Sequence, residues 1–334
     1  MLTKAIDSFQ KKERTMPKIR EEANKLRNIW SGFRSARVLI TANNYRVFDH
    51  LKTTQSAETI SQKLNTDLRA TEILLDALTG LGLLKKSSRK YINAPISNRF
   101  LVKDTPYYQG DIIRHANYLW KNWSALDEVV KTGKPAQRAR DHEAFVLGMH
   151  NLASLKAKNV IKAIGLRGVR TALDLGGGPG TYSIEMADKG VRVTLFDYSE
   201  TIEIAKRLIE KKNVKGINSI SGDFTVDDLG GGYDLVFVSQ ILHAYSEREN
   251  IEILKKCREA LNKDGRIVIQ EFFISRDKTH PIGGALFSVN MLVNTQYGRC
   301  YSPQEIKKWL IKSRFKNIKE RFMDDTVLVE GMKD

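Results

Sequence analysis

Residues 172–180 of the chain read ALDLGGGPG, an apolar run of strand length that enters a turn with four glycines. The residues that follow, from Thr181, have the pattern of a helix. Glycines let the backbone turn sharply and let a ligand approach the main chain, and the first turn of a helix offers free N–H groups. The stretch therefore predicts a strand–loop–helix unit with a ligand at the loop, although a plain tight turn is the alternative.

The glycine spacing separates two kinds of ligand. Gly176, Gly178 and Gly180 give G-x-G-x-G, whereas a dinucleotide fingerprint reads G-x-G-x-x-G and a P-loop continues into G-K-S/T. S-adenosylmethionine carries no phosphate, so a loop without a pyrophosphate cradle suits it. The spacing favours this cofactor over a dinucleotide.

The chain alternates strands and helices from about residue 166, which is typical of an α/β fold with a mostly parallel sheet. We expect helices near 181–188, 201–212, 247–261 and 303–313, and strands at 171–175, 192–196, 217–221, 233–238 and 266–271. Two more strands, 318–322 and 326–330, have no helix between them. They predict an antiparallel pair at the sheet edge.

Polar residues follow three further strands of this predicted sheet. Asp197 lies roughly 20 residues after the glycines, where an acid can accept hydrogen bonds from ribose hydroxyls. Asp223 and Phe224 could hold an adenine amino group and its ring. His243 could take a proton from a phenol-like hydroxyl. A helix cap, a turn with a core phenylalanine and a structural histidine are the alternatives, but open sheets bind ligands at these strand ends.

The first hundred residues predict a different domain. Helical patterns cover 22–52, 57–64 and 68–78, and a small hairpin follows between Leu83 and Ile92. Helix, helix, helix and hairpin is the order of a winged-helix domain, which could bind DNA or form a dimer. The helix that would read DNA has acids beside it that phosphates would repel, so dimerisation is the preferred interpretation; these acids are Asp67, Glu72 and Asp76.

Residues 106–165 look helical and contain an aromatic cluster that is either core or the wall of an apolar pocket, namely Tyr107, Tyr108, Tyr118, Trp120 and Trp123.

Composition limits the other function classes. The chain has 334 residues, is 41% hydrophobic and carries a net charge of +16. The lysines and arginines are dispersed, so we read them as a basic surface and expect no nucleic-acid partner. No run of about 18 apolar residues and no signal-peptide core occurs, so we expect no membrane partner and a cytoplasmic location. Cys257 and Cys300 have no zinc spacing, so we expect no metal.

At these residues the chain resembles the S-adenosylmethionine-dependent O-methyltransferase family, typified by plant caffeic acid and bacterial polyketide and hydroxyindole enzymes. The resemblance covers nearly the whole length. It implies a class I, Rossmann-like, seven-stranded methyltransferase domain at 166–334, preceded by an all-α winged-helix-like dimerisation domain at 1–105. Residues 106–165 would be a helical linker that contributes to the substrate pocket.

The resemblance also implies the roles of particular residues. The catalytic residues would be His243, as general base, and Glu271. The acceptor pocket would include Phe145, Met149, Asn290 and Met291, with core packing as the alternative for each. The cofactor would contact Gly176, Gly178, Gly180, Asp197, Asp223, Phe224 and Ser239, the last of these standing where plant members have lysine.

Two positions depart from the plant pattern. The plant H-D-W motif reads His243-Ala244-Tyr245 here, and the second glutamate that brackets the histidine falls on Cys300. The expected activity is methyl transfer to a hydroxyl of a small aromatic or polycyclic molecule by a homodimer. The alternatives are carbon methylation, a non-methylating enzyme that binds S-adenosylmethionine, and a DNA-binding regulator that senses it.

Overall fold

The computed structural model of the protein describes residues 2–136 and 140–334. These residues form two compact units, of which one ends at Pro106 and the other begins at Tyr107. The helices of the segment 106–165 therefore belong to the second unit. The separate roles expected for 1–105, 106–165 and 166–334 stay predictions.

The first unit combines helices with a small antiparallel sheet of strand order β1-β3-β2. The helical pattern over 22–52 is interrupted at Gly32 and at Arg46, whose φ of 54° is left-handed. In chain order the elements are α1 (Leu2–Ser31), α2 (Phe33–Asn44), α3 (Val47–His50), β1 (Gln55–Ser56), α4 (Ala57–Leu64), α5 (Leu68–Gly80), β2 (Leu84–Ser87), β3 (Lys90–Asn93) and α6 (Pro95–Phe100).

The first unit is therefore not all-α, as the resemblance implied, because it also contains this small sheet. The hairpin β2–β3 was predicted, but the third strand, β1, was not, because two residues are too few to show a period of two. The helix starts were readable, since Ser56 and Asp67 cap α4 and α5 by accepting hydrogen bonds from the backbone N–H groups of Thr59 and Ala70.

The second unit is built on a seven-stranded sheet of order β6-β5-β4-β7-β8-β10-β9. Its first five strands in that order are parallel, and β10 runs antiparallel to both of its neighbours. The antiparallel edge pair expected from the sequence is confirmed. The strands are β4 (Thr171–Leu175), β5 (Arg192–Asp197), β6 (Ile217–Ser221), β7 (Tyr233–Ser239), β8 (Leu261–Phe272), β9 (Lys316–Met323) and β10 (Thr326–Met332).

Alternating side chains of these strands build two hydrophobic layers. Leu173 and Leu175 of β4 point to the layer that holds Trp309, while Ala172 points to the opposite layer with Tyr182 and its neighbours. The first layer is covered by α13 (Glu247–Ala260) and α15 (Pro303–Lys312). The second is covered by α10 (Ala157–Ile164), α11 (Thr181–Ala187) and α12 (Ser199–Lys212).

One strand is longer than its sequence pattern. β8 begins at Leu261 rather than at Arg266, because its first residues pair with β7 across a register shift between Tyr233 and Leu235. Lys263, Asp264 and Gly265 break the apolar pattern there, so the sequence predicted a strand only from Arg266 onward.

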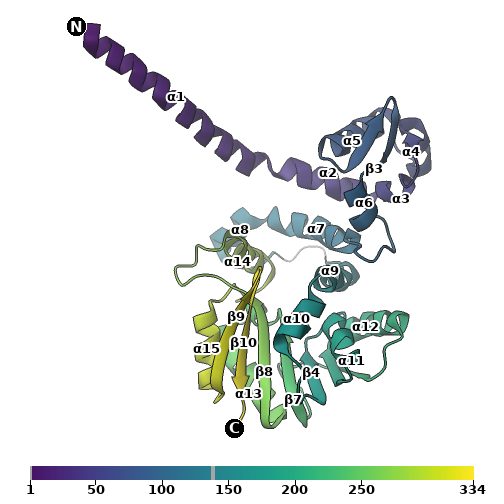
Figure 1. Ribbon diagram of the computed structural model, residues 1–334, viewed down its shortest axis with the longest axis vertical. Helices are drawn as coiled ribbons and strands as arrows, with labels where there is room; N and C mark the ends of the chain where they lie inside the picture. The colour runs from purple at the N-terminus through teal and green to yellow at the C-terminus, as the bar shows by residue number, and fades with distance from the viewer. Residues whose placement is uncertain (1, 137–139) are drawn as a thin grey trace. The chain divides into compact units, whose positions relative to one another are not determined.

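Further helices lie at one end of the sheet, the end opposite the C-terminus in Figure 1. β10 ends near the C-terminus and is antiparallel to β8. The parallel strands therefore finish at the opposite end of the sheet, where these helices lie. The side chain of Asn151 joins two of these helices, because its Oδ1 accepts from the backbone N–H groups of Asp111 and Ile112, at 3.1 and 3.2 Å. The helices are α7 (Gly110–Trp123), α8 (Leu126–Thr132), α9 (His142–Ser154) and α14 (Ile282–Asn294).

Among the residues that the structure describes, no helix is both long enough and apolar enough to cross a membrane.

Candidate active site

The glycine loop lies at the carboxyl end of β4. Gly176 has a φ of 60°, and a Cβ on it would lie 2.4 Å from Ile241 Cδ1, so any other residue would be strained there and would displace Ile241. A Cβ on Gly178 would meet no atom within 4 Å. Gly180, at a φ of 72°, ends the loop directly before α11. The loop thus packs against the protein at Gly176 and presents open backbone at Gly178, where a ligand can lie against it.

Asp197 is the last residue of β5 and is only 8% exposed. Its Oδ2 accepts from the backbone N–H of Gly178 at 2.8 Å, and its Oδ1 accepts from that of Tyr198 at 2.7 Å. Burial raises the pKa of Asp197, and these hydrogen bonds work in the opposite direction. A carboxylate has about four acceptor positions, so lone pairs remain for a ligand hydroxyl. The loop and this acid fit the ribose side of S-adenosylmethionine.

Asp223 and Phe224 follow β6. The Phe224 ring is buried beside the glycine loop, 3.4 Å from where a Cβ on Gly176 would stand. Its ring centroid lies 5.9 Å from that of Tyr245, in an edge-on arrangement. Oδ1 of Asp223 accepts from the backbone and hydroxyl of Thr225, at 2.9 and 2.6 Å. Thr225 therefore engages only one of the two carboxylate oxygens of Asp223.

Ser239 makes a hydrogen bond within the protein, although the resemblance implies that it contacts the cofactor. Its hydroxyl donates to Oε1 of Gln270 at 3.0 Å. That proton is committed to the protein, so a cofactor contact at Ser239 is restricted to the oxygen lone pairs. Ser239 therefore cannot donate a hydrogen bond to the cofactor, as a lysine at this position could.

Asp174 is a buried acid that the sequence analysis quoted but did not assign to the site. It is completely buried in β4; its Oδ2 accepts from Ser183 Oγ at 2.6 Å, and its Oδ1 has no partner among the described residues. Burial raises its pKa to about 6. A carboxyl group inside an otherwise apolar strand was the available signal.

His243 and Glu271 come together at the ends of β7 and β8. His243 Nδ1 lies 2.8 Å from Glu271 Oε2, and the Glu271 side chain is only 3% exposed. The ring of Phe287, from α14, meets the imidazole edge-on at 4.8 Å between centroids. Because a carboxylate can only accept, the geometry assigns the proton to Nδ1 and leaves the Nε2 lone pair free.

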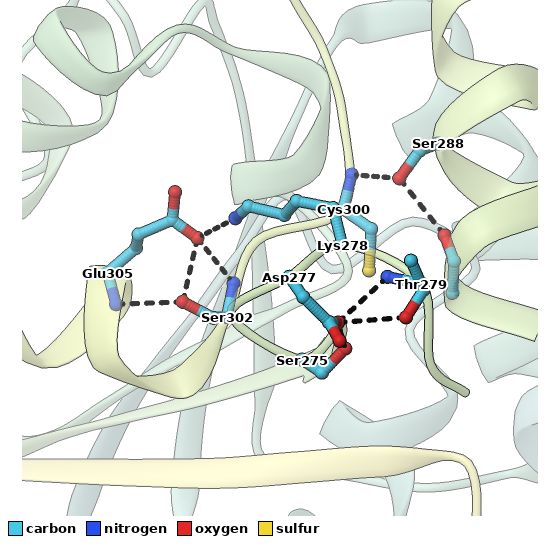
Figure 2. A network of polar contacts seen from close by, with 9 residues as sticks. Ser275, Asp277, Lys278, Thr279, Ser288, Cys300, Ser302 and Glu305 are labelled. Atoms are coloured by element: carbon cyan, nitrogen blue, oxygen red, sulfur yellow. Dashed lines mark hydrogen bonds and ion pairs between the residues drawn. The ribbon is translucent and has the colours of Figure 1, made fainter.

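Cys300 lies at the position expected for a second acid. Figure 2 shows its backbone nitrogen bound to the Ser288 hydroxyl of α14, at 3.1 Å, beside a loop that Lys278 ties to Glu305. The thiol is buried, and burial raises its pKa to about 12, so it stays neutral. Among the described residues, His243 makes a carboxylate contact with Glu271 alone.

The residues expected at the acceptor pocket come from two helices that both pack on α7. Asn290 Oδ1 accepts from Trp123 Nε1 at 2.9 Å and from Asn294 Nδ2 at 3.1 Å. Phe145 is 39% exposed and Met149 is partly buried on α9, whereas Met291 is only 8% exposed. Met291 therefore packs mainly into the protein, the alternative stated from the sequence.

Comparison with known proteins connects this geometry to a family. A family model for an O-methyltransferase domain matches residues 128–316, and one for an O-methyltransferase dimerisation domain matches 28–103. The 3-hydroxy-5-methyl-1-naphthoate 3-O-methyltransferase of Streptomyces sahachiroi is 33% identical over 265 residues, which cover 75% of this chain and 76% of that protein.

Two solved structures share the fold. Human N-acetylserotonin methyltransferase in complex with SAM matches with a TM-score of 0.85 at 23% identity, over 92% of this chain and 96% of that one. PigF with SAH matches with a TM-score of 0.85 at 26% identity, over 93% and 99% of the two chains. The class I fold expected from the sequence is confirmed.

Asp174 should make the stability of the protein depend on pH. The pKa of Asp174 in the folded protein is raised from 3.8 to about 6. The stabilising contribution of the protonated group to the free energy of unfolding is therefore fully present below pH 3.8 and is lost as the pH rises through 6. We expect the free energy of unfolding of Asp174→Asn, measured relative to that of the wild type, to increase by on the order of 1 to 2 kcal/mol when the pH is raised from 5 to 7.5. Urea unfolding at both pH values measures this difference, and parallel profiles of the two proteins would contradict it.

Proposed function

The chain belongs to the S-adenosylmethionine-dependent O-methyltransferase family, and on that premise we propose that it methylates a hydroxyl of a small aromatic or polycyclic molecule with His243 as general base. The observation that carries this proposal is the hydrogen bond between His243 Nδ1 and the buried carboxylate of Glu271. This bond keeps the proton on Nδ1 and leaves Nε2 able to accept a proton.

His243 performs the proton transfer in this proposal. Glu271 keeps the proton on Nδ1 and fixes the ring, so that Nε2 can accept the proton of the acceptor hydroxyl. Deprotonation makes the oxygen a stronger nucleophile. Phe287 packs against the imidazole in an edge-on arrangement. The absence of charge on Cys300 leaves the orientation of His243 to Glu271.

S-adenosylmethionine is the methyl donor, and when bound it supplies an electrophilic methyl group on a positively charged sulfur. We assign its ribose to Asp197 and its adenine to the surroundings of Phe224 and Asp223. The backbone of Gly176, Gly178 and Gly180 lines the approach to the loop, with Ser239 in a lesser role. The fit of Gly178 to close contact and the hydrogen bonds that hold Asp197 support this assignment.

Asn290 indicates what the acceptor carries besides its hydroxyl. The indole N–H of Trp123 can only donate, so the Asn290 oxygen must face it and the amide NH₂ must face away. That NH₂ has no partner among the described residues. We infer an acceptor with a carbonyl, carboxylate or ether oxygen at this position. The relative from Streptomyces acts, by its name, on a hydroxynaphthoate, which combines a hydroxyl and a carboxylate.

Labelled methyl transfer to a panel of hydroxyarenes tests the reaction and its base. We expect His243→Ala to lower kcat by about 10²- to 10⁴-fold, because general-base catalysis contributes about that much. Glu271→Gln should lose about 10²-fold or more, because an amide can also stabilise the wrong tautomer. Cys300→Ala is the matched control and should stay within about threefold, since the neutral thiol exerts little electrostatic effect on the base. Full activity of His243→Ala, or a product methylated at carbon, would contradict the proposal.

Asn290 should control which acceptor binds. Asn290→Asp keeps the oxygen that faces Trp123 but replaces the NH₂ donor with an oxygen. We expect its KM to rise about tenfold for acceptors that carry a carboxylate or carbonyl, because a donor to that group is lost, and to change little for simple phenols. Initial rates with matched pairs of hydroxyarenes, with and without the second oxygen, measure this. Equal KM changes for both members of each pair would remove Asn290 from the recognition of that oxygen.

We also propose that two copies of the chain associate through the first unit. Leu26, Ile29 and Trp30 share one face of α1 by their spacing and are 64%, 73% and 54% exposed. Such an apolar face is typical of a surface that a partner covers. In the same unit Lys86 is paired with Asp76 at 2.6 Å, so a basic residue of the hairpin is already neutralised. Both observations favour a dimer over DNA binding.

Charge on this face should separate the two copies. We expect the double variant Leu26→Glu and Ile29→Glu to be monomeric, because both carboxylates would have to be buried in the interface. Sedimentation equilibrium gives the mass directly. Val226→Glu, at a 75% exposed apolar position in the second unit, is the control and should leave the mass unchanged. A wild-type monomer, or a dimer that tolerates both glutamates, would overturn the assignment.

A further inference from the structure

His243 lies in a single turn of 3₁₀-helix between β7 and α13. The turn is η1 (Leu242–Ala244), and two backbone hydrogen bonds close it, from the N–H groups of Ala244 and Tyr245 at 3.0 and 3.2 Å. A 3₁₀ turn has poorer hydrogen-bond geometry than an α-helix, and one turn alone is a weak support. The position of the His243 ring therefore depends on the groups that hold this turn from outside.

Asn250, near the start of α13, bridges the two ends of the turn. Its side chain is completely buried, and its Nδ2 donates to Leu242 O at 2.9 Å and to Tyr245 O at 3.3 Å. Because both carbonyls can only accept, the amide nitrogen must face them, and Oδ1 is left without a partner among the described residues. One amide group thus fixes the separation of the carbonyls on either side of His243.

Both carbonyls have another donor besides Asn250. Leu242 O also accepts from the backbone N–H of Tyr245 at 3.2 Å, and Tyr245 O also accepts from the Tyr301 hydroxyl at 2.6 Å. Removal of the Asn250 amide would therefore leave neither carbonyl unpaired. The two hydrogen bonds from Asn250 define the geometry of the turn rather than satisfy groups that have no other partner.

The segment after α14 holds the turn from another direction. The backbone N–H of Arg299 donates to His243 O at 2.8 Å, and a Cβ on Gly298 would lie 2.5 Å from the same oxygen. Tyr301 is only 7% exposed, and its ring packs edge-on against Trp309 at 4.6 Å between centroids, which fixes the direction of its hydroxyl. Donors from two separate parts of the chain thus converge on the carbonyls around His243.

We propose that Asn250 and Tyr301 are positioning residues for His243, which act through the carbonyls of its turn to keep the imidazole against Glu271. The proposal rests on the proposed function, in which His243 is the general base. Among the described residues, His243 makes a carboxylate contact with Glu271 alone, at 2.8 Å. A shift of about 1 Å would take this contact out of hydrogen-bond range, and misplacement of that size can cost about 10²-fold in rate.

Methyl-transfer kinetics with the best acceptor of the hydroxyarene panel test this role. Asn250→Ala should lower kcat by about 10- to 100-fold through misplacement of the base. Tyr301→Phe should lower it by about three- to tenfold, the range of one hydrogen bond. The KM for S-adenosylmethionine should stay within about twofold in both variants, because the loss falls on the transition state.

A second set of variants, made in the His243→Ala background, separates positioning from a general structural role. There each change should alter kcat by less than about twofold, because no base remains to be positioned. A loss of the same size in both backgrounds would overturn the proposal, as would wild-type kcat in Asn250→Ala and Tyr301→Phe. Tyr301→Phe keeps the packed ring and carries the same test where Asn250→Ala does not fold.

Hydrogen exchange followed by mass spectrometry gives a readout that does not depend on activity. In both variants a peptide that covers residues 241–246 should exchange about three- to tenfold faster than in the wild type, because an external support of the turn is lost. The increase should exceed that in peptides from β4 and β5. An equal increase in all three peptides, or unchanged exchange in the turn, would contradict the proposal.

Tyr233→Phe is the matched control for Tyr301→Phe. Tyr233 is also buried, at 8% exposure, and its hydroxyl also donates to a backbone carbonyl, that of Leu229 at 3.3 Å. It begins β7, whereas His243 follows the other end of that strand. Its kcat should stay within about twofold of wild type, because the change is distant from the base. A loss as large as that of Tyr301→Phe would mean that any buried hydroxyl matters equally, and the proposal would fail.

His243→Ala distinguishes failure of this inference from failure of the proposed function. If its kcat equals that of the wild type, His243 is not the base and the inference falls with that assignment. If its kcat falls by about 10²-fold or more while Asn250→Ala and Tyr301→Phe both stay within about twofold of wild type, the base is correct and only the positioning role is wrong.

Discussion

The parallel pairing of β4 with β5 on one side and β7 on the other is the constraint on which the rest of the structure depends. Parallel strands end at the same edge of a sheet, so the segments that follow them must meet there. Gly176 follows β4, Asp197 ends β5 and His243 comes shortly after β7. Residues about 70 positions apart in the chain thereby share one site, and helices on both faces keep the sheet covered.

Three buried carboxyl groups surround this edge, and their different partners give them different properties. Glu271 meets an imidazole, which can use the negative charge to hold its own proton in place. Asp197 is surrounded by backbone N–H groups that stabilise its ionised form against burial. Among the described residues, Asp174 accepts only from Ser183, through its hydroxyl and its backbone N–H, so burial dominates and the pKa of Asp174 rises to about 6. The same chemical group thus has three different environments, which we propose suit Glu271 to orienting an imidazole and Asp197 to accepting from a ligand, while Asp174 stays in the core.

Strands β4 to β7 and the helices between them could be predicted because their patterns are local. An apolar run next to glycines needs no distant partner to be recognised, and the strand ends then place Asp197 and His243. Strand β1 and the first residues of β8 could not be predicted, because their pairing depends on β3 and β7 rather than on their own composition.

The sequence by itself determined the fold class, the glycine loop and the acids that end the strands, because strand period, turn chemistry and charge are properties of short segments. Only the tertiary structure decided which of those groups act together. It brings Glu271 into hydrogen-bond contact with His243 and buries Cys300, which stays neutral. It also orients the Asn290 amide through the hydrogen bond from Trp123, and it pairs the Ser239 hydroxyl with Gln270. These outcomes depend on distances of about 3 Å between residues far apart in the chain, which no local pattern encodes.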